Sequence, residues 1–314
     1  MKEIGLGAWG FSGDAYGPIK IEEALDVLRS AIDHKVRFID TSDSYGQGRS
    51  ERVIGNFISS KYIKRDELII ATKGGLLPHK TFHMPCDFSK DYISSCIEGS
   101  LNRLNTDYID VYQLHSPDVK DVIENDKLLK MLEKKKNDGT IRNIGISARS
   151  PEDAAKLLKV YPFDSVQVNY NIIDHRLDDE LKKGDDNWKS KFIIARTPFA
   201  FGYLTGNLND NMSSLSEDDH RKKWPVSQVR LWLNALEKFN DFNLKYQLTP
   251  IETALLYCLS NVNISMVIPG MMSVQQVVEN TKVLERDLFT DEQLYEINEI
   301  YESIDWFIPG VKKD

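Results

Sequence analysis

The sequence predicts a (β/α)8 barrel, and three observations favour that fold. Short, continuously apolar runs alternate with amphipathic segments along the chain. An apolar run without polar alternation is typical of a strand covered on both faces, and strand–helix alternation is typical of a parallel sheet. There are eight such runs, the number of parallel strands that closes a barrel.

The elements are predicted in order along the chain. The strands fall at 3–8, 36–40, 68–73, 108–115, 141–147, 165–170, 191–197 and 264–270. Helical periodicity predicts helices at 21–33, 50–60, 89–104, 126–137, 151–159, 227–243, 250–260 and 273–283. Helix-start signals support three helices: Ser150 before Pro151, and the capping boxes that Thr249 and Thr290 begin.

The main alternative is an open, doubly wound sheet. That fold usually carries a GxGxxG turn at the start of a helix, and the segment that begins at Gly46 matches only its first half. No linker rich in Pro, Gly or Ser divides the chain, so residues 1–314 are predicted to form a single domain. The longest irregular segment is about 199–226, and a loop of that length is usually either functional, such as a lid, or disordered.

Composition excludes several classes of function. The chain has 40 Lys and Arg against 48 Asp and Glu, a net charge of −8, which argues against binding to nucleic acid or anionic lipid. Residues 253–278 carry no charge but contain many polar residues, which indicates helix, strand, turn and helix rather than a membrane span. Three scattered cysteines and no signal-like start favour a cytoplasmic protein.

Four polar residues follow the apolar runs at one predicted edge of the barrel. Asp40 ends the second strand, Tyr45 follows it in a turn, Lys73 ends the third strand and His115 ends the fourth. Active sites of such barrels lie at the carboxyl ends of the strands. An ammonium beside a phenol lowers the phenol pKa, and a carboxylate keeps that ammonium charged. We therefore expect Tyr45 to donate a proton to a carbonyl oxygen, with Lys73 tuning it, Asp40 holding Lys73 and His115 hydrogen-bonding the substrate.

The chain resembles the aldo-keto reductase superfamily over nearly its full length. The matching segments are IGLGAWG at 4–10, FIDTSDSYGQGRSERVIG at 38–55, ATKGG at 71–75, YIDVYQLHSPD at 108–118, GTIRNIGIS at 139–147, VQVNYN at 166–171, ARTPFAFGYLTG at 195–206 and VIPGMMSVQQVVEN at 267–280. The resemblance implies a (β/α)8 barrel that reduces carbonyl compounds with NAD(P)H. It also implies that Asp40, Tyr45, Lys73 and His115 are the catalytic tetrad.

The resemblance also implies a nicotinamide site, with two departures from the family pattern. Ser147 and Gln167 match the residues that bind the carboxamide, but Ala148 stands where the family usually has Asn. Arg196 replaces the aromatic residue on which the ring stacks, and a planar guanidinium can also stack. The alternative for Arg196 is an ion pair with an acid of the barrel. The further residues that the resemblance assigns to the cofactor are Gly7, Ala8, Trp9 and Pro198.

The phosphate-binding end is expected after the last strand. Gly270 leads into a helix whose N-terminus offers N–H groups to an anion, and Gln276, Glu279 and Asn280 match the family positions around the adenosine. The family often has a basic residue there that faces the 2′-phosphate of NADP, and this chain has none. We expect NADP(H), because the family favours it, and NAD(H) is the alternative.

The substrate pocket is expected between Trp9, the loop after Lys73 and the 199–226 loop. His79, His83 and Cys86 have a spacing that suggests zinc ligands, but no fourth ligand lies nearby, so no metal site is expected. A mouth with polar residues and few aromatics, Phe82, Tyr203 and Trp224 among them, favours a polar, sugar-like carbonyl substrate.

Two other functions stay open. One is a cofactor-binding barrel with a regulatory or redox-sensing role and little turnover. The other is a dehydrogenase or epimerase of sugars that uses bound cofactor. The C-terminal stripe of Leu294, Ile297, Ile300 and Ile304 is more typical of core than of an interface, so we expect a monomer or a weak homo-oligomer.

Overall fold

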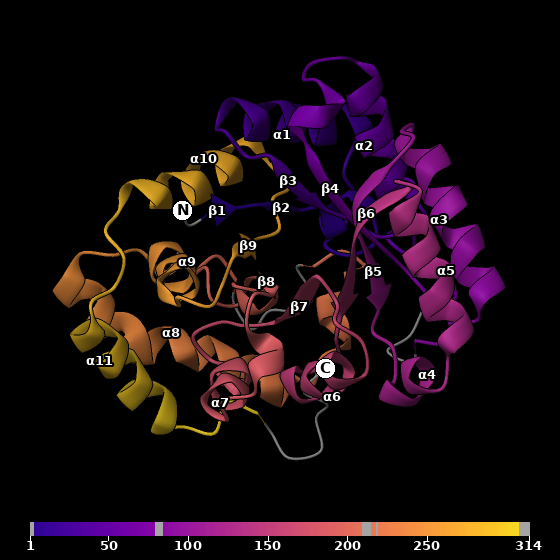
Figure 1. Ribbon diagram of the computed structural model, residues 1–314. Helices are drawn as coiled ribbons and strands as arrows, with labels where there is room; N and C mark the ends of the chain where they lie inside the picture. Colours follow the sequence, from indigo (N-terminus) through magenta and orange to yellow (C-terminus); the bar gives the residue numbers. More distant parts are fainter. Residues whose placement is uncertain (1–2, 79–83, 209–214, 218, 308–314) are drawn as a thin grey trace.

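The computed structural model describes residues 3–78, 84–208, 215–217 and 219–307, and its strands form one parallel sheet (Figure 1). The strands are β1 (Glu3–Ile4), β2 (Leu6–Gly7), β3 (Phe38–Asp40), β4 (Ile69–Gly74), β5 (Ile109–His115), β6 (Ile141–Ser147), β7 (Ser165–Asn169), β8 (Phe192–Arg196) and β9 (Met266–Ile268). β1 pairs with β9 and β2 pairs with β3, so residues 3–7 close the sheet into a barrel. The two short strands together take the place of one, and the predicted (β/α)8 barrel is confirmed.

Helices surround the strands on the outside of the barrel (Figure 1). They are α1 (Ile21–Asp33), α2 (Arg49–Ser59), α3 (Lys90–Leu104), α4 (Val119–Ile123), α5 (Asp126–Asn137), α6 (Pro151–Val160), α7 (Arg176–Lys182), α8 (Val226–Tyr246), α9 (Pro250–Ser260), α10 (Val274–Lys282) and α11 (Asp291–Glu302). The eight predicted helices are confirmed, with ends that differ by up to three residues. Of the remaining three helices, α11 follows the capping box predicted at Thr290. The other two, α4 and α7, were not predicted, because five and seven residues are too few for a helical period to emerge.

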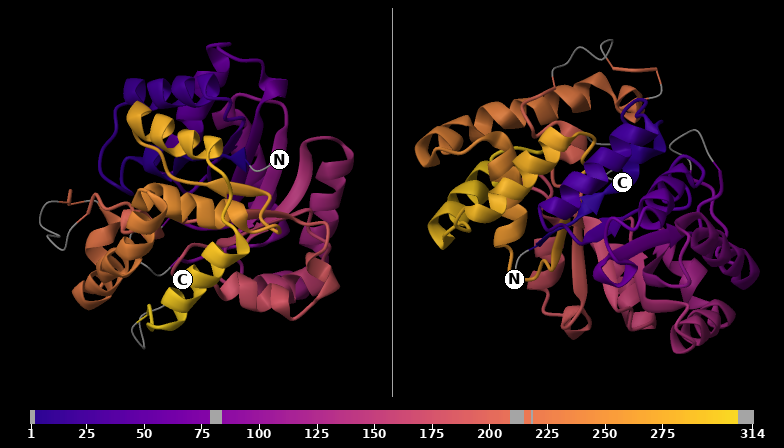
Figure 2. Two further views of the ribbon diagram at one scale, coloured as in Figure 1. Left: turned by 90° about the vertical axis from the view of Figure 1, so that its left-hand side faces the viewer. Right: turned by 90° about the horizontal axis from the view of Figure 1, so that it is seen from above.

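The predicted helix starts form as expected. The Ser150 hydroxyl accepts a hydrogen bond from the Asp153 N–H at 3.1 Å. Thr249 and Thr290 each form a complete capping box with the residue three positions later. The C-terminal apolar stripe packs against the core, with Ile297 fully buried, and α11 lies beside α8 on the outside of the barrel (Figure 2).

The uncharged segment 253–278 forms the end of α9, then β9, a turn and the start of α10, as predicted. Among the described residues, we find no helix that is both long and apolar enough to cross a membrane.

The inside of the barrel holds an apolar layer with a polar layer above it. Phe38, Ala71, Val111, Ile194, Met266 and Ile268 form a separate apolar cluster. Side chains two residues apart on a strand share a face, so the residues two positions after Phe38, Ala71, Val111 and Ile194 also face inward. Those positions are Asp40, Lys73, Gln113 and Arg196. The strands thus place polar groups inside the barrel, at its carboxyl end.

Candidate active site

Asp40 and Lys73 form a buried ion pair inside the barrel. The Lys73 Nζ donates to Asp40 Oδ1 at 2.6 Å, to the Thr41 carbonyl oxygen at 2.8 Å and to the Tyr45 hydroxyl oxygen at 3.2 Å. The two side chains of the pair are only 1% and 3% exposed, so water does not screen their charges. The ammonium is therefore held beside the phenol by a carboxylate, in the arrangement that the sequence predicts.

Tyr45 reaches this pair from a tight turn after β3. Gly46 has a φ of +57°, and a Cβ at this position would lie 2.5 Å from the Ser12 carbonyl oxygen. Only glycine combines that conformation with so close an approach. The turn consequently packs against the short helix η1 (Ala8–Ser12), which carries Trp9, and the rings of Trp9 and Tyr45 lie 6.1 Å apart.

His115 lies at the same rim, at the end of β5. Its ring centroid is 6.0 Å from that of Tyr45, at a steep angle of 82°. Its Nδ1 lies 3.0 Å from the Ser42 hydroxyl, which fixes the orientation of the imidazole. All four predicted catalytic residues are thus brought together.

The electrostatics of Tyr45 differ in part from the expectation. Burial raises the pKa of the Tyr45 hydroxyl above its ordinary value, and the opposing effect of Lys73 does not outweigh it. The expectation of a lowered phenol pKa is wrong in this respect, because the sequence does not reveal how deeply the phenol is buried. A raised pKa keeps Tyr45 protonated at neutral pH, which a proton donor requires.

Lys73 remains an ammonium. Burial alone lowers the pKa of Lys73, but the nearby Asp40 carboxylate and Tyr45 hydroxyl raise the net value above the ordinary one.

Two amide side chains, one of them missed by the sequence analysis, complete the surroundings of Asp40. Gln167 donates from Nε2 to Asp40 Oδ2 at 2.7 Å, and Gln113 does so at 3.3 Å. The Ser147 hydroxyl donates to Gln167 Oε1 at 3.3 Å. Ser147 and Gln167, both predicted to bind the carboxamide, therefore lie together beside the tetrad. Gln113 could have been found from the sequence, since it lies two residues before His115 on the same face of a strand.

Arg196 lies in the same polar layer, at the end of β8. Its Nη2 donates to the Ala148 carbonyl oxygen at 2.9 Å, and its Nε has no hydrogen-bond partner among the described residues. The alternative of an ion pair with a barrel acid is not found in the part of the chain that the structure describes.

The predicted adenosine and phosphate end lies after β9, beside the loop after β2. Gly7 and Gly270 form a parallel bridge between these two segments. The Ala8 carbonyl accepts a hydrogen bond from the Ser50 hydroxyl at 2.9 Å, and buried Pro198 follows β8. On α10, Gln276 accepts from the Met272 N–H at 2.7 Å, and Glu279 accepts from Gln275 at 2.7 Å.

The residues present fit a nicotinamide cofactor at two points. The Asn280 Nδ2 and the Arg196 Nε are buried donors without a partner among the described residues, and such groups are costly unless a ligand satisfies them. Of the residues that the structure describes, a Cβ at Gly270 would have just the Gly7 carbonyl oxygen within 4.0 Å, so this backbone is open to a bulky anion. Both ends of the predicted site therefore offer groups that a dinucleotide can use.

The region beside Tyr45 where the substrate mouth is expected is aromatic, contrary to the expectation of few aromatic rings. We call this group the mouth cluster, and its rings lie 4.5 to 6.5 Å from one another in successive contacts: Trp9, Tyr16, Phe201, His220, Trp224 and Trp232. It joins the loop after β2 to the described part of the 199–226 segment, which forms the short helices η4 (Ala200–Gly202) and η6 (His220–Lys223). Segments about two hundred residues apart in sequence build it, so no local pattern could have predicted it.

The zinc-like spacing cannot be followed in the structure. His79 and His83, together with Lys80 and Phe82, lie outside the described residues, and the Cys86 thiol lies 3.9 Å from an Asp121 carboxylate oxygen. Within the described ranges, no group of three or more His, Cys, Asp or Glu side chains has an arrangement that could hold a metal ion.

Comparisons with known proteins place the chain in a family. Residues 3–302 match the model of the aldo/keto reductase family. The chain is 31% identical to the aldo-keto reductase yakc [NADP(+)] of Schizosaccharomyces pombe, over 94% of this chain and 87% of that protein. It is 25% identical to the NADH-specific methylglyoxal reductase of Escherichia coli, over 92% and 91%.

A solved structure agrees with the family match. The holo form of the aldo-keto reductase AKR11C1 from Bacillus halodurans superposes with a TM-score of 0.76 at 27% identity, covering 95% of this chain and 91% of that one. The chain therefore belongs to the aldo/keto reductase family, whose members are NAD(P)-dependent oxidoreductases.

Proposed function

We propose that the chain reduces an aldehyde or a ketone to an alcohol, with Tyr45 as the proton donor. The observation that carries this proposal is the Lys73 ammonium, which donates at once to the Asp40 carboxylate and to the Tyr45 hydroxyl in a buried site. A bound nicotinamide cofactor supplies a hydride to the carbonyl carbon.

The four tetrad residues then have distinct tasks. Tyr45 gives its proton to the carbonyl oxygen as negative charge develops there. Lys73 stabilises the phenolate that remains, because its ammonium lies 3.2 Å from the phenol oxygen. Asp40 holds Lys73 in place, and His115, oriented by Ser42, hydrogen-bonds the substrate oxygen.

The residues that would hold the cofactor are those predicted from the sequence. Ser147, Gln167 and Arg196, which lie in or beside the polar layer that holds Asp40, would bind the nicotinamide. Gln276, Glu279 and Asn280 on α10 would bind the adenosine. We propose NADP(H) as the cofactor on the strength of the family, with NAD(H) as the competing form, because α10 has Lys282 at its last position as its only basic residue.

Titration of the wild-type protein with NADPH and then NADH tests this site. We expect both to quench tryptophan fluorescence, since Trp9 lies beside Tyr45, and the ratio of the two dissociation constants gives the preference. Binding without any turnover over a broad carbonyl panel would instead favour a regulatory barrel. Failure of both nucleotides to bind would contradict the proposal.

We further propose a polar, sugar-like carbonyl substrate whose ring or chain packs its C–H groups against the mouth cluster. Aromatic faces offer large apolar area at fixed positions, which suits a substrate that is apolar on one side and hydroxylated on the other. A kinetic panel of sugar-type and aromatic aldehydes should give the higher kcat/KM for the sugar-type compounds. Equal or higher values for the aromatic aldehydes would contradict this substrate class.

A further inference from the structure

Arg196 brings a second positive charge into the polar layer of the barrel. It follows Ile194 of the inner apolar cluster by two residues, so its side chain starts on the inward face of β8. Its guanidinium extends as far as the loop after β6, where Nη2 donates to the Ala148 carbonyl at 2.9 Å. The two positions that depart from the family pattern, Ala148 and Arg196, are therefore in direct contact.

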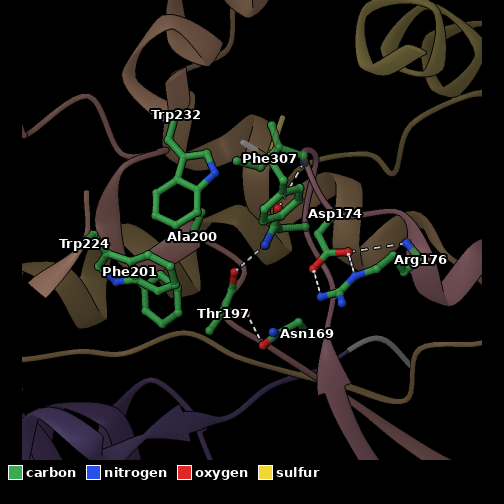
Figure 3. A pocket seen from close by; sticks show the side chains of 11 residues that line it. Asn169, Asp174, Arg176, Thr197, Ala200, Phe201, Trp224, Trp232 and Phe307 are labelled. Atoms are coloured by element: carbon green, nitrogen blue, oxygen red, sulfur yellow. Dashed lines mark hydrogen bonds and ion pairs between the residues drawn. The ribbon is translucent and has the colours of Figure 1, made fainter. Parts of the chain in front are cut away.

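No carboxylate among the described residues forms an ion pair with Arg196, although Asp40 and Asp174 lie near enough to influence its charge. Asp40 is already paired with Lys73 at 2.6 Å. The Asp174 carboxylate accepts two hydrogen bonds from Arg176, from Nε to Oδ1 at 2.8 Å and from Nη2 to Oδ2 at 2.7 Å (Figure 3). Asn169 pairs with Arg196 across strands β7 and β8, and Thr197 follows Arg196 in the chain. Figure 3 also shows that the Thr197 hydroxyl donates a hydrogen bond to Asn169 Oδ1. Lys73, Arg196 and Asp40 thus leave the polar layer with one excess positive charge.

A partly buried cation that has no ion pair among the described residues is an unfavourable neighbour for another cation. Low-dielectric surroundings strengthen repulsion between like charges. Burial lowers the pKa of the Arg196 guanidinium, and the nearby Asp40 and Asp174 carboxylates only partly oppose this effect. The nicotinamide ring is neutral in the reduced cofactor and positively charged in the oxidised one, so Arg196 acts differently on the two forms.

We infer that Arg196 makes the site bind the reduced cofactor more tightly than the oxidised one, so that the oxidised form competes only weakly for the site. The inference rests on the proposed function, since it needs the nicotinamide to bind beside Gln167 and Tyr45. The Arg196 Nε–H is closed off from solvent and has no partner among the described residues, so a small movement of the side chain would let it donate to the carboxamide oxygen of either form. That hydrogen bond would stabilise the complexes with reduced and oxidised cofactor equally, whereas the positive charge of Arg196 would destabilise only the complex with the oxidised form.

The test compares the affinities of reduced and oxidised cofactor in the wild type and in two variants. Arg196→Gln removes the charge but keeps an N–H donor of similar reach, and Arg196→Lys keeps the charge. Dissociation constants for NADPH, NADP+, NADH and NAD+ are measured by fluorescence quenching and by calorimetry.

We expect the wild type to bind the reduced form at least about tenfold more tightly than the oxidised form, and this preference to fall by about tenfold or more in Arg196→Gln. Arg196→Lys should keep it. Equal affinities of the wild type for the two oxidation states would overturn the inference without use of any variant. A preference that Arg196→Gln leaves unchanged, or an equal loss for both forms, would also overturn it and make Arg196 a hydrogen-bonding residue only. A wild type that binds no nucleotide in either state would instead overturn the proposed function itself.

Discussion

Replacing Tyr45 with phenylalanine is expected to lower kcat for carbonyl reduction by about 10² to 10⁴, because general acid catalysis contributes a factor of that size. Phenylalanine retains the ring and loses only the hydroxyl, which accepts a hydrogen bond from Lys73 at 3.2 Å. The ring contacts with Trp9 and His115 involve carbon atoms and remain possible. The variant should therefore fold and bind cofactor as the wild type does, and steady-state kinetics with a fluorescence titration separates the two effects.

Tyr203→Phe is a matched control for this variant. Tyr203 is buried against Trp232 of the mouth cluster, and its hydroxyl has no hydrogen-bond partner among the described residues. Loss of this hydroxyl should leave kcat nearly unchanged. Wild-type turnover by Tyr45→Phe would show that the proton comes from another group.

The pH dependence of the rate of reduction by the wild type is a second test of Tyr45 as the proton donor. A proton donor is active below its pKa and inactive above it, and burial raises the pKa of Tyr45 above its ordinary value near 10. The rate of reduction should therefore stay level through neutral pH and fall only in strongly alkaline solution. A decline centred near neutral pH would assign the proton donor to a group with a lower pKa.

The strands and the tetrad could be predicted because their signals are local. A buried parallel strand leaves a continuous apolar run, and the residue that ends it is placed at the carboxyl end of the barrel by the fold itself. Asp40, Lys73 and His115 follow from this rule alone. Tyr45 required the additional assumption that a turn brings it back to the strand ends, which the close approach of Gly46 to Ser12 makes possible.

Features that depend on distant segments could not be predicted. The mouth cluster joins Trp9 to His220, and Arg196 reaches Ala148 across forty-eight positions of sequence. The net pKa of Tyr45 depends on its burial, which no pattern near Tyr45 indicates. These properties arise where segments far apart in the sequence pack together, and such packing leaves no periodic pattern from which to infer it.

Replacing Lys73 with methionine is expected to affect stability as strongly as chemistry. Removal of one partner from a buried ion pair leaves the other charge without compensation, at a cost of about 3–5 kcal/mol in the free energy of unfolding. The amides of Gln113 and Gln167 still donate to Asp40 Oδ2, which places the expected loss near the lower end of that range. Reduction should also be lost, because no ammonium remains to stabilise the Tyr45 phenolate. Urea unfolding and kinetics measure the two losses separately.

The double variant Asp40→Asn, Lys73→Met distinguishes the architectural role of the pair from its catalytic role. With both charges removed, no buried charge is left unpaired, so stability should recover most of what Lys73→Met loses. Activity should stay lost, since the phenol still lacks its ammonium. Lys189→Met serves as the control, because Lys189 and Asp186 form an exposed pair, 78% and 81% exposed, whose loss should change stability by no more than about 1 kcal/mol. If the loss in the double variant equalled the sum of the losses in Lys73→Met and in Asp40→Asn alone, the two side chains would contribute independently and an unpaired charge would not explain the loss in Lys73→Met. Recovered stability with no activity would mean that the Asp40–Lys73 pair serves proton donation by Tyr45 rather than the stability of the barrel.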